Sequence, residues 1–252
     1  MAKLLKGAEV VSALNRKILE ETNALKAQGV VPTLALVRAG ERADDLAYER
    51  GAMKRVGNVG IEGKQFILPA DVSQTELIGT IRRINADETI HGVLIFRPLP
   101  KHIDDGAVRA ALLPEKDVDG ITEGSLAGVF AGTGRGFPPC TAQACIETLD
   151  YYGVELQGKN VVVIGRSLVI GKPVAMMLLQ RNATVTICHT KTKNMAEVTR
   201  QADILIVAAG RAGVIGADYV SAGQTVIDVG INFNETGGMV GDVDFGAVEP
   251  IA

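Results

Sequence analysis

The chain has 252 residues, a formal net charge of −3 and no tryptophan. Hydrophobic residues make up 47% of it and charged residues 22%, a mixture typical of a globular protein with a sizeable core. Without a basic run it lacks the charge pattern of a nucleic-acid-binding protein. No apolar run could span a membrane and no signal peptide is recognisable, so we expect a cytoplasmic protein without a membrane partner. The three cysteines have no metal-binding spacing, and no metal site is expected.

Helical and strand-like patterns alternate along the first half of the chain. Apolar residues at helical spacing predict a helix over residues 8–28, with Val11, Leu14, Ile18 and Leu25 on one face. Ser73 and Glu76 form a capping box that begins a later helix. The elements expected after the first helix are a strand over 32–40, a helix over 43–57, a strand over 65–68, the capped helix ending near 86 and a strand over 91–96.

Residues 114–139 differ from what precedes them. They are acidic, rich in glycine and without periodicity, and they end in Pro138-Pro139. Long segments without secondary structure inside a compact domain usually carry function, so we expect a functional loop here. A helix over 141–152 follows, and we place the domain boundary near its start. The expected domains are therefore 1–139 and 140–252.

The second domain has the pattern of a Rossmann fold. Strands are expected over 160–164, 184–188, 204–208 and 225–229, with helices over 172–180 and 195–202. Alternation of strands with helices favours a parallel sheet, and this series is typical of a mononucleotide-binding unit. The predicted fold class is therefore α/β, with an N-terminal three-layer α/β domain followed by a C-terminal Rossmann domain that contains a parallel sheet.

The segment Gly165-Arg-Ser-Leu-Val-Ile-Gly171 lies between a predicted strand and a predicted helix. Glycine permits a tight turn and a close approach of phosphate, and the free N–H groups of a helix N-terminus attract anions. Gly165, Arg166, Ser167 and Gly171 are therefore predicted to bind a dinucleotide cofactor. Because the spacing is not GxGxxG, the alternative is an ordinary glycine turn.

The end of the second Rossmann strand indicates which cofactor is bound. Enzymes that use NAD usually have an acid there for the ribose hydroxyls, whereas a nearby arginine suits the 2′-phosphate of NADP. The strand ends in Cys188-His-Thr-Lys191 without an acid. Arg166 and Thr190, with His189 or Lys191, could hold a dianionic phosphate, although Lys191 alone also fits a solvated surface charge. NADP is therefore the predicted cofactor.

Several motifs, in a fixed order, resemble those of one family, the methylenetetrahydrofolate dehydrogenase/methenyltetrahydrofolate cyclohydrolase enzymes. The motifs are Pro114-Glu-Lys-Asp-Val-Asp-Gly120, Pro139-Cys-Thr141, Gly165-Arg-Ser with Gly171 and Pro173, Cys188-His-Thr190, Asp228-Val-Gly-Ile-Asn232 and Gly241-Asp-Val243. They extend over nearly the whole chain. The resemblance implies a homodimer that oxidises 5,10-methylenetetrahydrofolate to 5,10-methenyltetrahydrofolate with NADP, in the one-carbon metabolism that serves purine biosynthesis.

The resemblance also implies a cleft between the two domains that holds a tetrahydrofolate derivative. In the family the acid at the position of Asp119 approaches the pterin, and a carboxylate suits an amino-pyrimidine edge because it can accept two hydrogen bonds. Tyr48 and Asp119 are the implied catalytic residues. The alternative that Asp117 or Asp119 only caps a turn stays open. The residues implied on the folate side are Tyr48, Pro98, Asp117 and Asp119, and those added on the cofactor side are Thr141, Gly230 and Ile231.

Two positions depart from the family pattern for hydrolysis. The family's Tyr-x-x-x-Lys is here Tyr48-Glu-Arg-Gly-Ala52, and its Gln-x-Pro-x-Pro is here Phe96-Arg-Pro-Leu-Pro100. Lys54 lies six residues after Tyr48, about 600° around a helix, and so on another face. Alanine cannot transfer protons as a lysine can, so we expect cyclohydrolase activity to be lost and a separate cyclohydrolase to work alongside this enzyme.

Two alternatives to a monofunctional dehydrogenase stay open. In the first, the enzyme is bifunctional and another group, such as Lys54 or Arg97, restores hydrolysis. In the second, the chain is a non-catalytic folate- or nucleotide-binding protein. The sequence ends at Ala252, before the Pro-Gly-Gly-rich loop and the final helix that the resemblance implies.

Overall fold

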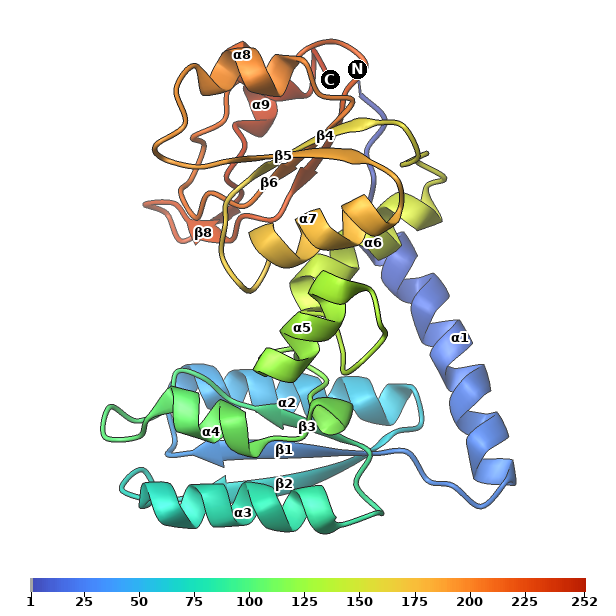
Figure 1. The fold of residues 1–252 in the computed structure, drawn as a ribbon, viewed down its shortest axis with the longest axis vertical. Helices are drawn as coiled ribbons and strands as arrows, with labels where there is room; N and C mark the ends of the chain where they lie inside the picture. Colours follow the sequence, from blue (N-terminus) through green and yellow to red (C-terminus); the bar gives the residue numbers. More distant parts are fainter. Residues whose placement is uncertain (1) are drawn as a thin grey trace. The chain divides into compact units, whose positions relative to one another are not determined.

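The computed structural model describes residues 2–252, which divide into two compact units. The N-terminal unit consists of Gly7–Gly128 and Thr133–Pro138. The C-terminal unit consists of Pro139–Ala252, the short segment Val129–Gly132 and the N-terminal residues up to Lys6. Both units contain a parallel sheet covered by helices, so the predicted fold class is confirmed (Figure 1).

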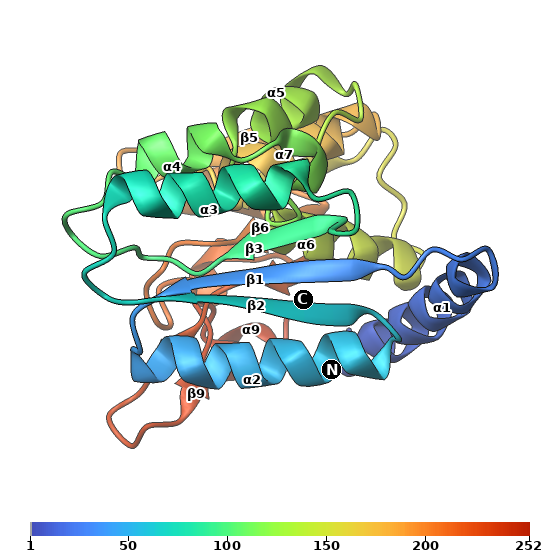
Figure 2. The ribbon, with the colours of Figure 1, turned by 90° about the horizontal axis from the view of Figure 1, so that it is seen from below.

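The N-terminal unit has three layers built around a three-stranded parallel sheet. The sheet has the strand order β2 (Glu62–Leu68), β1 (Thr33–Ala39), β3 (Gly92–Ile95). Helix α2 (Ala43–Asn58) covers one face, and α3 (Gln74–Ala86) and α4 (Asp105–Ala111) cover the other (Figure 2). Side chains alternate between the faces of a strand, so Val37 of β1 packs with Leu77 and Ile81 of α3, while Arg38 lies on the α2 face.

The N-cap half of the capping box predicted for α3 is confirmed. The hydroxyl of Ser73 accepts a hydrogen bond from the backbone N–H of Glu76 at 3.2 Å, and the helix begins at Gln74. This bond satisfies one of the N–H groups that every helix N-terminus leaves without a backbone acceptor.

The first helix, α1 (Gly7–Ala27), is confirmed, but its apolar stripe is not its buried side. Val10 and Thr22 are its buried residues, whereas Val11 and Leu25 are 42% and 40% exposed. Thr22 lies where Gly60 approaches the helix: a Cβ on Gly60 would come 3.0 Å from the Thr22 methyl group. The apolar spacing therefore predicted the helix correctly but not the side that is covered within the described residues.

The loop predicted over 114–139 contains two helical segments, and this prediction is corrected. A 3₁₀ turn spans Pro114–Lys116, and α5 spans Glu123–Ala131. A buried carboxylate organises the turn between them: Asp117 accepts hydrogen bonds from the backbone N–H groups of Ile121 and Thr122 at 3.1 and 2.7 Å. The hydroxyl of Thr122 also accepts from the backbone N–H of Ser125 at 3.1 Å, so α5 has a local capping residue that was not recognised in the sequence. Helix α4 was also not predicted.

A buried ion pair joins β1 to α2. Nε of Arg38 donates to Oε2 of Glu49 at 3.2 Å, and the two side chains are only 4% and 6% exposed. Nη1 of Arg38 donates to the carbonyl oxygen of Gly40, which continues the network to the end of β1. Oε1 of Glu49 is buried, and residues 2–252 offer it no hydrogen-bond partner. A buried charge is tolerated only when it is paired, so each member depends on the other.

Replacing Arg38 with methionine is expected to lower the free energy of unfolding by about 3–5 kcal/mol, because Glu49 would keep a buried charge without its partner. The double replacement Arg38→Met with Glu49→Leu removes both charges and should recover most of that loss. Urea unfolding of the wild type and the two variants measures the differences. A single variant as stable as the wild type would contradict a buried ionised pair.

The C-terminal unit has a four-stranded parallel sheet in the order β5 (Thr184–Cys188), β4 (Asn160–Ile164), β6 (Ile204–Val207), β7 (Thr225–Asp228). Helices α6 (Cys140–Tyr151) and α7 (Gly171–Gln180) pack on one face, against Val161 and Val163. Helices α8 (Met195–Arg200) and α9 (Phe245–Val248) lie against the other face, around Val162 and Ile164. The predicted strands and the helices α6, α7 and α8 are confirmed to within two residues at each end. The elements not predicted are the hairpin β8 (Asn232–Phe233) and β9 (Met239–Val240), α9 and a 3₁₀ turn at Ala217–Tyr219.

Among the helices of residues 2–252, none is both long enough and apolar enough to cross a membrane.

Candidate active site

A cavity of about 360 Å³ lies at the carboxyl end of the N-terminal sheet. Ligands of open α/β sheets bind at this end, outside the carboxyl ends of the strands. Helix α2 and the loop before it form one wall, and the end of β3 forms a second. Asp119, in the turn after Lys116, also lines the cavity. The lining residues are Arg42, Asp44, Asp45, Tyr48, Leu94, Ile95, Phe96, Arg97 and Asp119.

Two aromatic rings meet in the wall of this cavity. The rings of Tyr48 and Phe96 have centroids 5.5 Å apart and planes at 75°, an edge-to-face contact. Phe96 is 6% exposed, whereas Tyr48 is 62% exposed and so presents its ring to a ligand. Ala52, one turn after Tyr48 on α2, is half-buried. Phe96 occupies the position at which the family pattern has a glutamine. Its ring packs against the ring of Tyr48 and so supports it.

Polar groups line the rim of the same cavity. Nε and Nη2 of Arg97 donate to the two carboxylate oxygens of Asp105 at 2.6 and 2.7 Å. Nε of Arg109 donates to the same carboxylate at 2.9 Å. Partial burial raises the pKa of Asp105, but the hydrogen bonds from Arg97 and Arg109 outweigh it and hold that pKa below its usual range. The carboxylate therefore stays ionised and fixes the direction of Arg97.

In the C-terminal unit, the carboxyl ends of the strands are level with one another. Ile164 of β4 pairs with Cys188 of β5 and with Val207 of β6, and Val207 pairs with Asp228 of β7. Because the strands are parallel, the segments that follow Ile164, Cys188, Val207 and Asp228 all leave the sheet at its carboxyl end. A dinucleotide binds at this end of the sheet in such folds.

Gly165 and Gly171 are required by the geometry of the first of these loops. Gly165 has φ +124°, and a Cβ there would collide with the carbonyl oxygen of Ala208. A Cβ on Gly171 would collide with the carbonyl oxygen of Gly165. The backbone thus closes on itself at the start of α7, where the N–H of Lys172 donates to the carbonyl oxygen of Ser167 at 3.0 Å, while Arg166 and Ser167 are exposed. A cradle that only glycine permits fits a pyrophosphate group.

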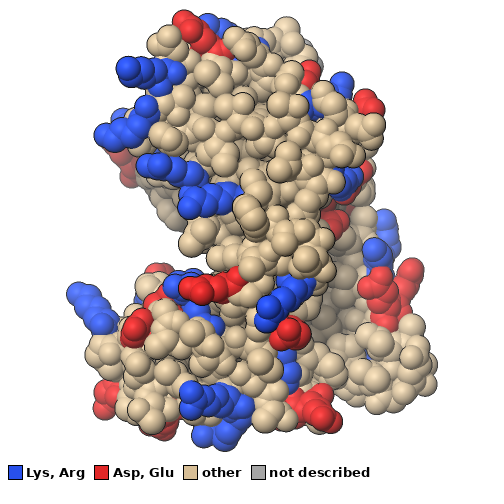
Figure 3. All heavy atoms as spheres, viewed as in Figure 1, with Lys and Arg blue, Asp and Glu red and all other residues tan. Residues whose placement is uncertain are grey.

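The loop after β5 is ordered by its own side chains. The backbone N–H of His189 donates to the hydroxyl of Thr192 at 2.9 Å, and that of Lys191 donates to Nδ1 of His189 at 3.1 Å. Thr190 is exposed. The exposed basic residues of these loops are Arg166, Lys172, Lys191, Lys193 and Arg211. Figure 3 shows Lys and Arg side chains gathered along one edge of this unit, as expected where an anionic cofactor binds.

Two carboxylates hold the segment after β7 in place. Asp228 accepts hydrogen bonds from the N–H groups of Gly230, Asp242 and Val243 at 2.9, 3.0 and 3.1 Å. Asp242 is fully buried and accepts from Gly210 N–H, Arg211 N–H and the side-chain amide of Asn232. A Cβ on Gly230 would collide with Asp242, so this position requires glycine. Ile231, the next residue, is left 73% exposed.

Comparison with known proteins agrees with this description of both units. Residues 5–119 match the family described as "Tetrahydrofolate dehydrogenase/cyclohydrolase, catalytic domain". Residues 139–252 match the companion family described as "Tetrahydrofolate dehydrogenase/cyclohydrolase, NAD(P)-binding domain". The chain belongs to the tetrahydrofolate dehydrogenase/cyclohydrolase family. The predicted family is therefore confirmed, and the C-terminal unit is its NAD(P)-binding domain.

Individual members of the family are similar over nearly their whole length. "Bifunctional protein FolD" of Carboxydothermus hydrogenoformans is 49% identical over 253 residues, which cover 100% of this chain and 88% of the relative. The protein of the same name from Clostridioides difficile is 46% identical over 246 residues, covering 98% and 86%. The crystal structure of the bifunctional enzyme FolD from Campylobacter jejuni superposes with a TM-score of 0.95 at 36% identity, covering 99% and 88%. The Trypanosoma brucei enzyme, solved with NADP cofactor and an inhibitor, gives 0.88 at 34% identity, covering 98% and 86%.

The predicted site residues fall into two groups in the family's domains. In the catalytic domain, Tyr48 and Asp119 line one cavity, and the carbonyl oxygen of Pro98 accepts a hydrogen bond from Nη1 of Arg42 at 3.2 Å. Thr141, in the first turn of α6, belongs to the NAD(P)-binding domain. Gly171 is the first residue of α7, and the other members of that group lie in the loops at the strand ends: Gly165, Arg166, Ser167, Thr190, Gly230 and Ile231.

The prediction that Asp117 contacts the substrate is corrected. Its side chain is fully buried, and Oδ2 accepts from the hydroxyl of Ser125 at 2.7 Å as well as from the backbone. A carboxylate enclosed in this way is not available to a ligand, so Asp117 caps the turn that presents Asp119. This is the alternative that the sequence left open for it. Asp119, only two residues on, lines the cavity.

Sequence reasoning missed several residues of the site. Arg42, Asp44 and Asp45 line the cavity from the start of α2 but belong to no motif that the sequence analysis used. Asp228 and Asp242 were quoted only within motifs, and their role is to fix the loop that carries Gly230. A signal existed for Asp242: an acid between Gly241 and Val243, both apolar or small, is unusual unless hydrogen bonds satisfy it.

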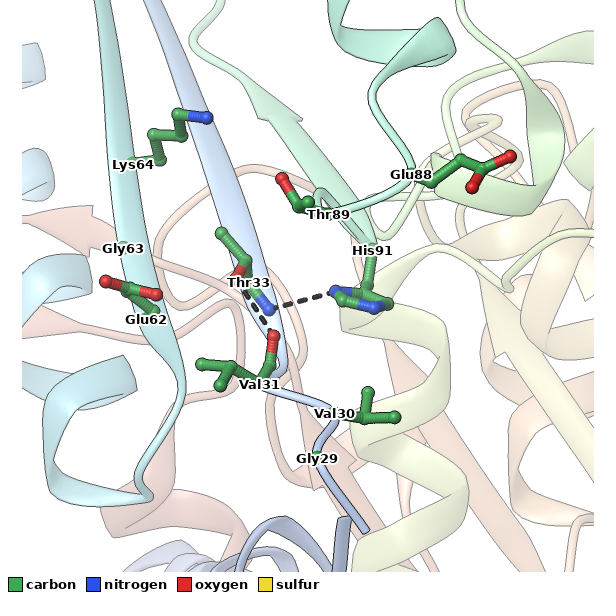
Figure 4. Close-up of a pocket in the computed structure, with 10 residues that line it drawn as sticks. All are labelled: Gly29, Val30, Val31, Thr33, Glu62, Gly63, Lys64, Glu88, Thr89 and His91. Carbon is green, nitrogen blue, oxygen red and sulfur yellow. Dashed lines mark hydrogen bonds between the residues drawn. The ribbon is translucent and has the colours of Figure 1, made fainter. Parts of the chain in front are cut away.

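A second cavity in the catalytic domain, of about 560 Å³, lies at the amino end of the sheet (Figure 4). Thr33, Lys64 and His91 line it, and Nδ1 of His91 accepts the N–H of Thr33 at 3.2 Å. This cavity is larger, but it lies away from the carboxyl ends of the strands. We therefore assign the site to the smaller cavity, which contains Tyr48 and Asp119.

Proposed function

We propose that this chain oxidises 5,10-methylenetetrahydrofolate to 5,10-methenyltetrahydrofolate with NADP as the hydride acceptor, in one-carbon metabolism. The observation that carries the proposal is the cavity in which Tyr48 and Asp119 meet at the carboxyl end of the catalytic domain's sheet. Membership of the family, whose second domain binds NAD(P), supplies the cofactor class.

In this proposal each catalytic-domain residue has a binding or orienting role. The carboxylate of Asp119 accepts hydrogen bonds from the amino-pyrimidine edge of the pterin and so sets the position of the reacting carbon. The exposed ring of Tyr48, supported by Phe96, packs against the flat part of the substrate. Hydride loss from a folate methylene group depends mainly on such positioning, because the folate nitrogen stabilises the resulting cation.

NADP would be held at the strand ends of the NAD(P)-binding domain and would supply the hydride acceptor. Gly165 and Gly171 leave room for its pyrophosphate at the start of α7, and Arg166 with Thr190 would hold the 2′-phosphate. Gly230 and Ile231 would line the nicotinamide, with Thr141 as a further contact. In the Trypanosoma brucei relative the bound cofactor is NADP.

Replacing Arg166 with alanine is expected to raise the dissociation constant of NADP by roughly 10–150-fold, because a hydrogen bond to a charged group contributes about 1.5–3 kcal/mol. NAD, which has no 2′-phosphate, should bind with nearly unchanged affinity. Calorimetric titration of both cofactors measures this. Lys159→Ala, at the amino end of β4, is the control. If both cofactors weakened equally, Arg166 would be structural and the phosphate assignment wrong.

We further propose that the cyclohydrolase activity is lost. Opening of the methenyl ring requires water addition and proton transfer, and Ala52 lacks the amine that the family pattern has at this position. Phe96 likewise lacks the amide, and its ring packs on Tyr48. A separate cyclohydrolase would then act on the product.

The second candidate is a bifunctional dehydrogenase/cyclohydrolase. It is favoured by the relatives from Carboxydothermus hydrogenoformans and Clostridioides difficile, each named a bifunctional protein. Of the groups considered as replacements, Arg97 lines the cavity, and Lys54 is exposed and not among the lining residues. An arginine stays protonated and cannot accept a proton, which argues against Arg97 as the base.

We also propose a cytoplasmic homodimer. The strand β2 is an edge strand of its sheet and has an exposed apolar side chain, Ile67, at 53%. Exposed strand edges are natural pairing surfaces for a second chain. Sedimentation of the purified protein would reveal the assembly.

The experiment that tests the dehydrogenase is the initial rate of NADPH formation from methylenetetrahydrofolate. We expect reduction of NADP to require the folate, and NAD to be a poor substitute. Binding of folate and NADP without turnover would instead support a non-catalytic binding protein. Absence of both binding and turnover in a folded sample would reject the assignment of the site.

A further inference from the structure

Asp45 is a buried acid in the folate cavity to which the proposed function gives no role. It lies in the first turn of α2 and lines the cavity, and its side chain is only 11% exposed. Its neighbour Asp44 also lines the cavity, but that side chain is 92% exposed. The dipole of a helix stabilises a carboxylate near its N-terminus, which accounts for an acid at either position but not for the burial of one of them.

The carboxylate of Asp45 is only weakly paired. Within residues 2–252 the nearest cation is Nε of Arg42 at 3.9 Å, the outer limit of an ion pair, and no group there donates a hydrogen bond to the carboxylate. Arg97, the other cation of the lining, is already bound to both carboxylate oxygens of Asp105. A buried carboxylate with so little compensation costs stability, so a cation brought by a ligand would bind favourably beside it.

Asp45 shares a face of α2 with the residues that border the reacting part of the folate. Residues 45, 48 and 52 follow one another at intervals of three and four, so they lie on one face of the helix. Tyr48 packs against the substrate in the proposed function, and the family pattern has its proton-transferring lysine at the position of Ala52. This face therefore has a carboxylate at one end and no amine at the other.

Positive charge appears on the folate during the proposed reaction. The methylene carbon loses one hydrogen together with both electrons of its C–H bond. These form the new C–H bond of the nicotinamide ring, which loses its own positive charge. The carbon keeps its bonds to two nitrogens and shares the new positive charge with them. A fixed carboxylate near such a charge lowers the energy of the transition state, because it need not move as the charge develops.

We propose that Asp45 stabilises the methenyl cation, so that the enzyme binds 5,10-methenyltetrahydrofolate more tightly than neutral tetrahydrofolate. This inference rests on the proposed function and deepens it by assigning the group that faces the developing charge. An amine at position 52 would place a second positive charge beside the cation, and Ala52 avoids this. Replacing the carboxylate with an amide should weaken binding of the cation roughly 10–30-fold, as expected for loss of one unit charge several ångströms away in a partly enclosed site.

The test measures the dissociation constants of methenyltetrahydrofolate and tetrahydrofolate by calorimetric titration of the wild type and its variants. We expect Asp45→Asn to show this loss for the cation and almost none for the neutral folate. Asp45→Glu keeps the charge and should retain part of the preference. Asp44→Asn removes the same charge from a position screened by water, so its effect should be smaller. Asp71→Asn, in an exposed turn, is the control and should keep the full preference.

The same variants separate an electrostatic role of Asp45 from a structural one. In Asp45→Asn, single-turnover oxidation of methylenetetrahydrofolate should slow by a similar factor. The KM for that substrate should change little, because it is neutral at the reacting carbon. The melting temperature should fall no further than that of Asp44→Asn, because the charge removed was poorly paired.

Equal losses of affinity for the cation and the neutral folate in Asp45→Asn would overturn the inference while leaving the dehydrogenase intact. So would unchanged affinity for both. Were the wild type to hydrolyse the cation during the titration, the change in the single-turnover rate would decide in its place. If the wild type oxidised no folate, the proposed function would fail by itself, and the two dissociation constants would still decide the role of Asp45, since they need no turnover.

Discussion

Methenyltetrahydrofolate is expected to survive in the presence of this enzyme, decaying no faster than in buffer alone. Removing a group that transfers protons typically lowers a rate by about 10²–10⁴-fold, and both Ala52 and Phe96 lack the groups that the family pattern has there. The remaining aromatic pair, Tyr48 and Phe96, packs edge to face and provides surface for binding. The measurement is the absorbance decay of methenyltetrahydrofolate with and without enzyme, in a buffer that does not itself catalyse ring opening.

The double variant Ala52→Lys with Phe96→Gln tests whether these positions are the cause. The lysine would lie one turn after Tyr48 on α2, and the glutamine would follow β3 in the wall of the same cavity. We expect a gain of hydrolysis with dehydrogenation retained. Ala52→Met with Phe96→Gln differs only in the amine and should show no gain. Wild-type hydrolysis at a rate comparable to dehydrogenation would contradict the loss and favour the bifunctional enzyme.

Replacing Asp119 with asparagine is expected to reduce kcat/KM for the folate by roughly 10–150-fold. The change removes a charged acceptor, and a hydrogen bond to a charged group contributes about 1.5–3 kcal/mol. NADP affinity should change little, because the cavity that Asp119 lines belongs to the catalytic domain. Steady-state kinetics with each substrate varied in turn separate the two effects.

Asp71→Asn, in an exposed turn of the same unit, provides the control for loss of a surface carboxylate. Melting temperatures of the variants distinguish a carboxylate that binds the folate from one that stabilises the fold. A large fall in the melting temperature of Asp119→Asn, with folate and NADP affected together, would assign Asp119 to capping a turn. Asp117, whose carboxylate is buried in hydrogen bonds to Ile121, Thr122 and Ser125, already has that role.

The strands of the NAD(P)-binding domain could be predicted closely because each one is a short apolar run bounded by glycine or polar residues. Helix α3 could be predicted to its first residue because Ser73 and Glu76 are a local signal. Helix α5 could not, since its own residues have little amphipathic pattern, although Thr122, whose hydroxyl accepts from the N–H of Ser125, is a local capping residue. The buried side of α1 depends on contacts such as that of Thr22 with Gly60, which periodicity does not contain.

For the site, the residues at the strand ends could be predicted from the sequence. The residues that contact them and hold them in place could not. The requirement for glycine at position 165 follows from a turn between a strand and a helix, but the clash that enforces it comes from Ala208 on another strand. Arg42 reaches the cavity through the loop before α2, and Arg97 is fixed by Asp105 and Arg109 on α4, a helix the sequence did not reveal. Such pairings form only in the tertiary structure, so the order of residues along the chain does not reveal them.

Product analysis after incubation with methylenetetrahydrofolate and NADP tests the central claim most directly. We expect NADPH to equal the sum of methenyltetrahydrofolate and its 10-formyl hydrolysis product, with the 10-formyl product no higher than the same concentration of methenyltetrahydrofolate gives in buffer without enzyme. Chromatography of the folates alongside absorbance of NADPH gives both quantities from one reaction. Folded enzyme that leaves NADP unreduced would contradict the dehydrogenase, and 10-formyltetrahydrofolate formed in step with NADPH would contradict its restriction to that single reaction.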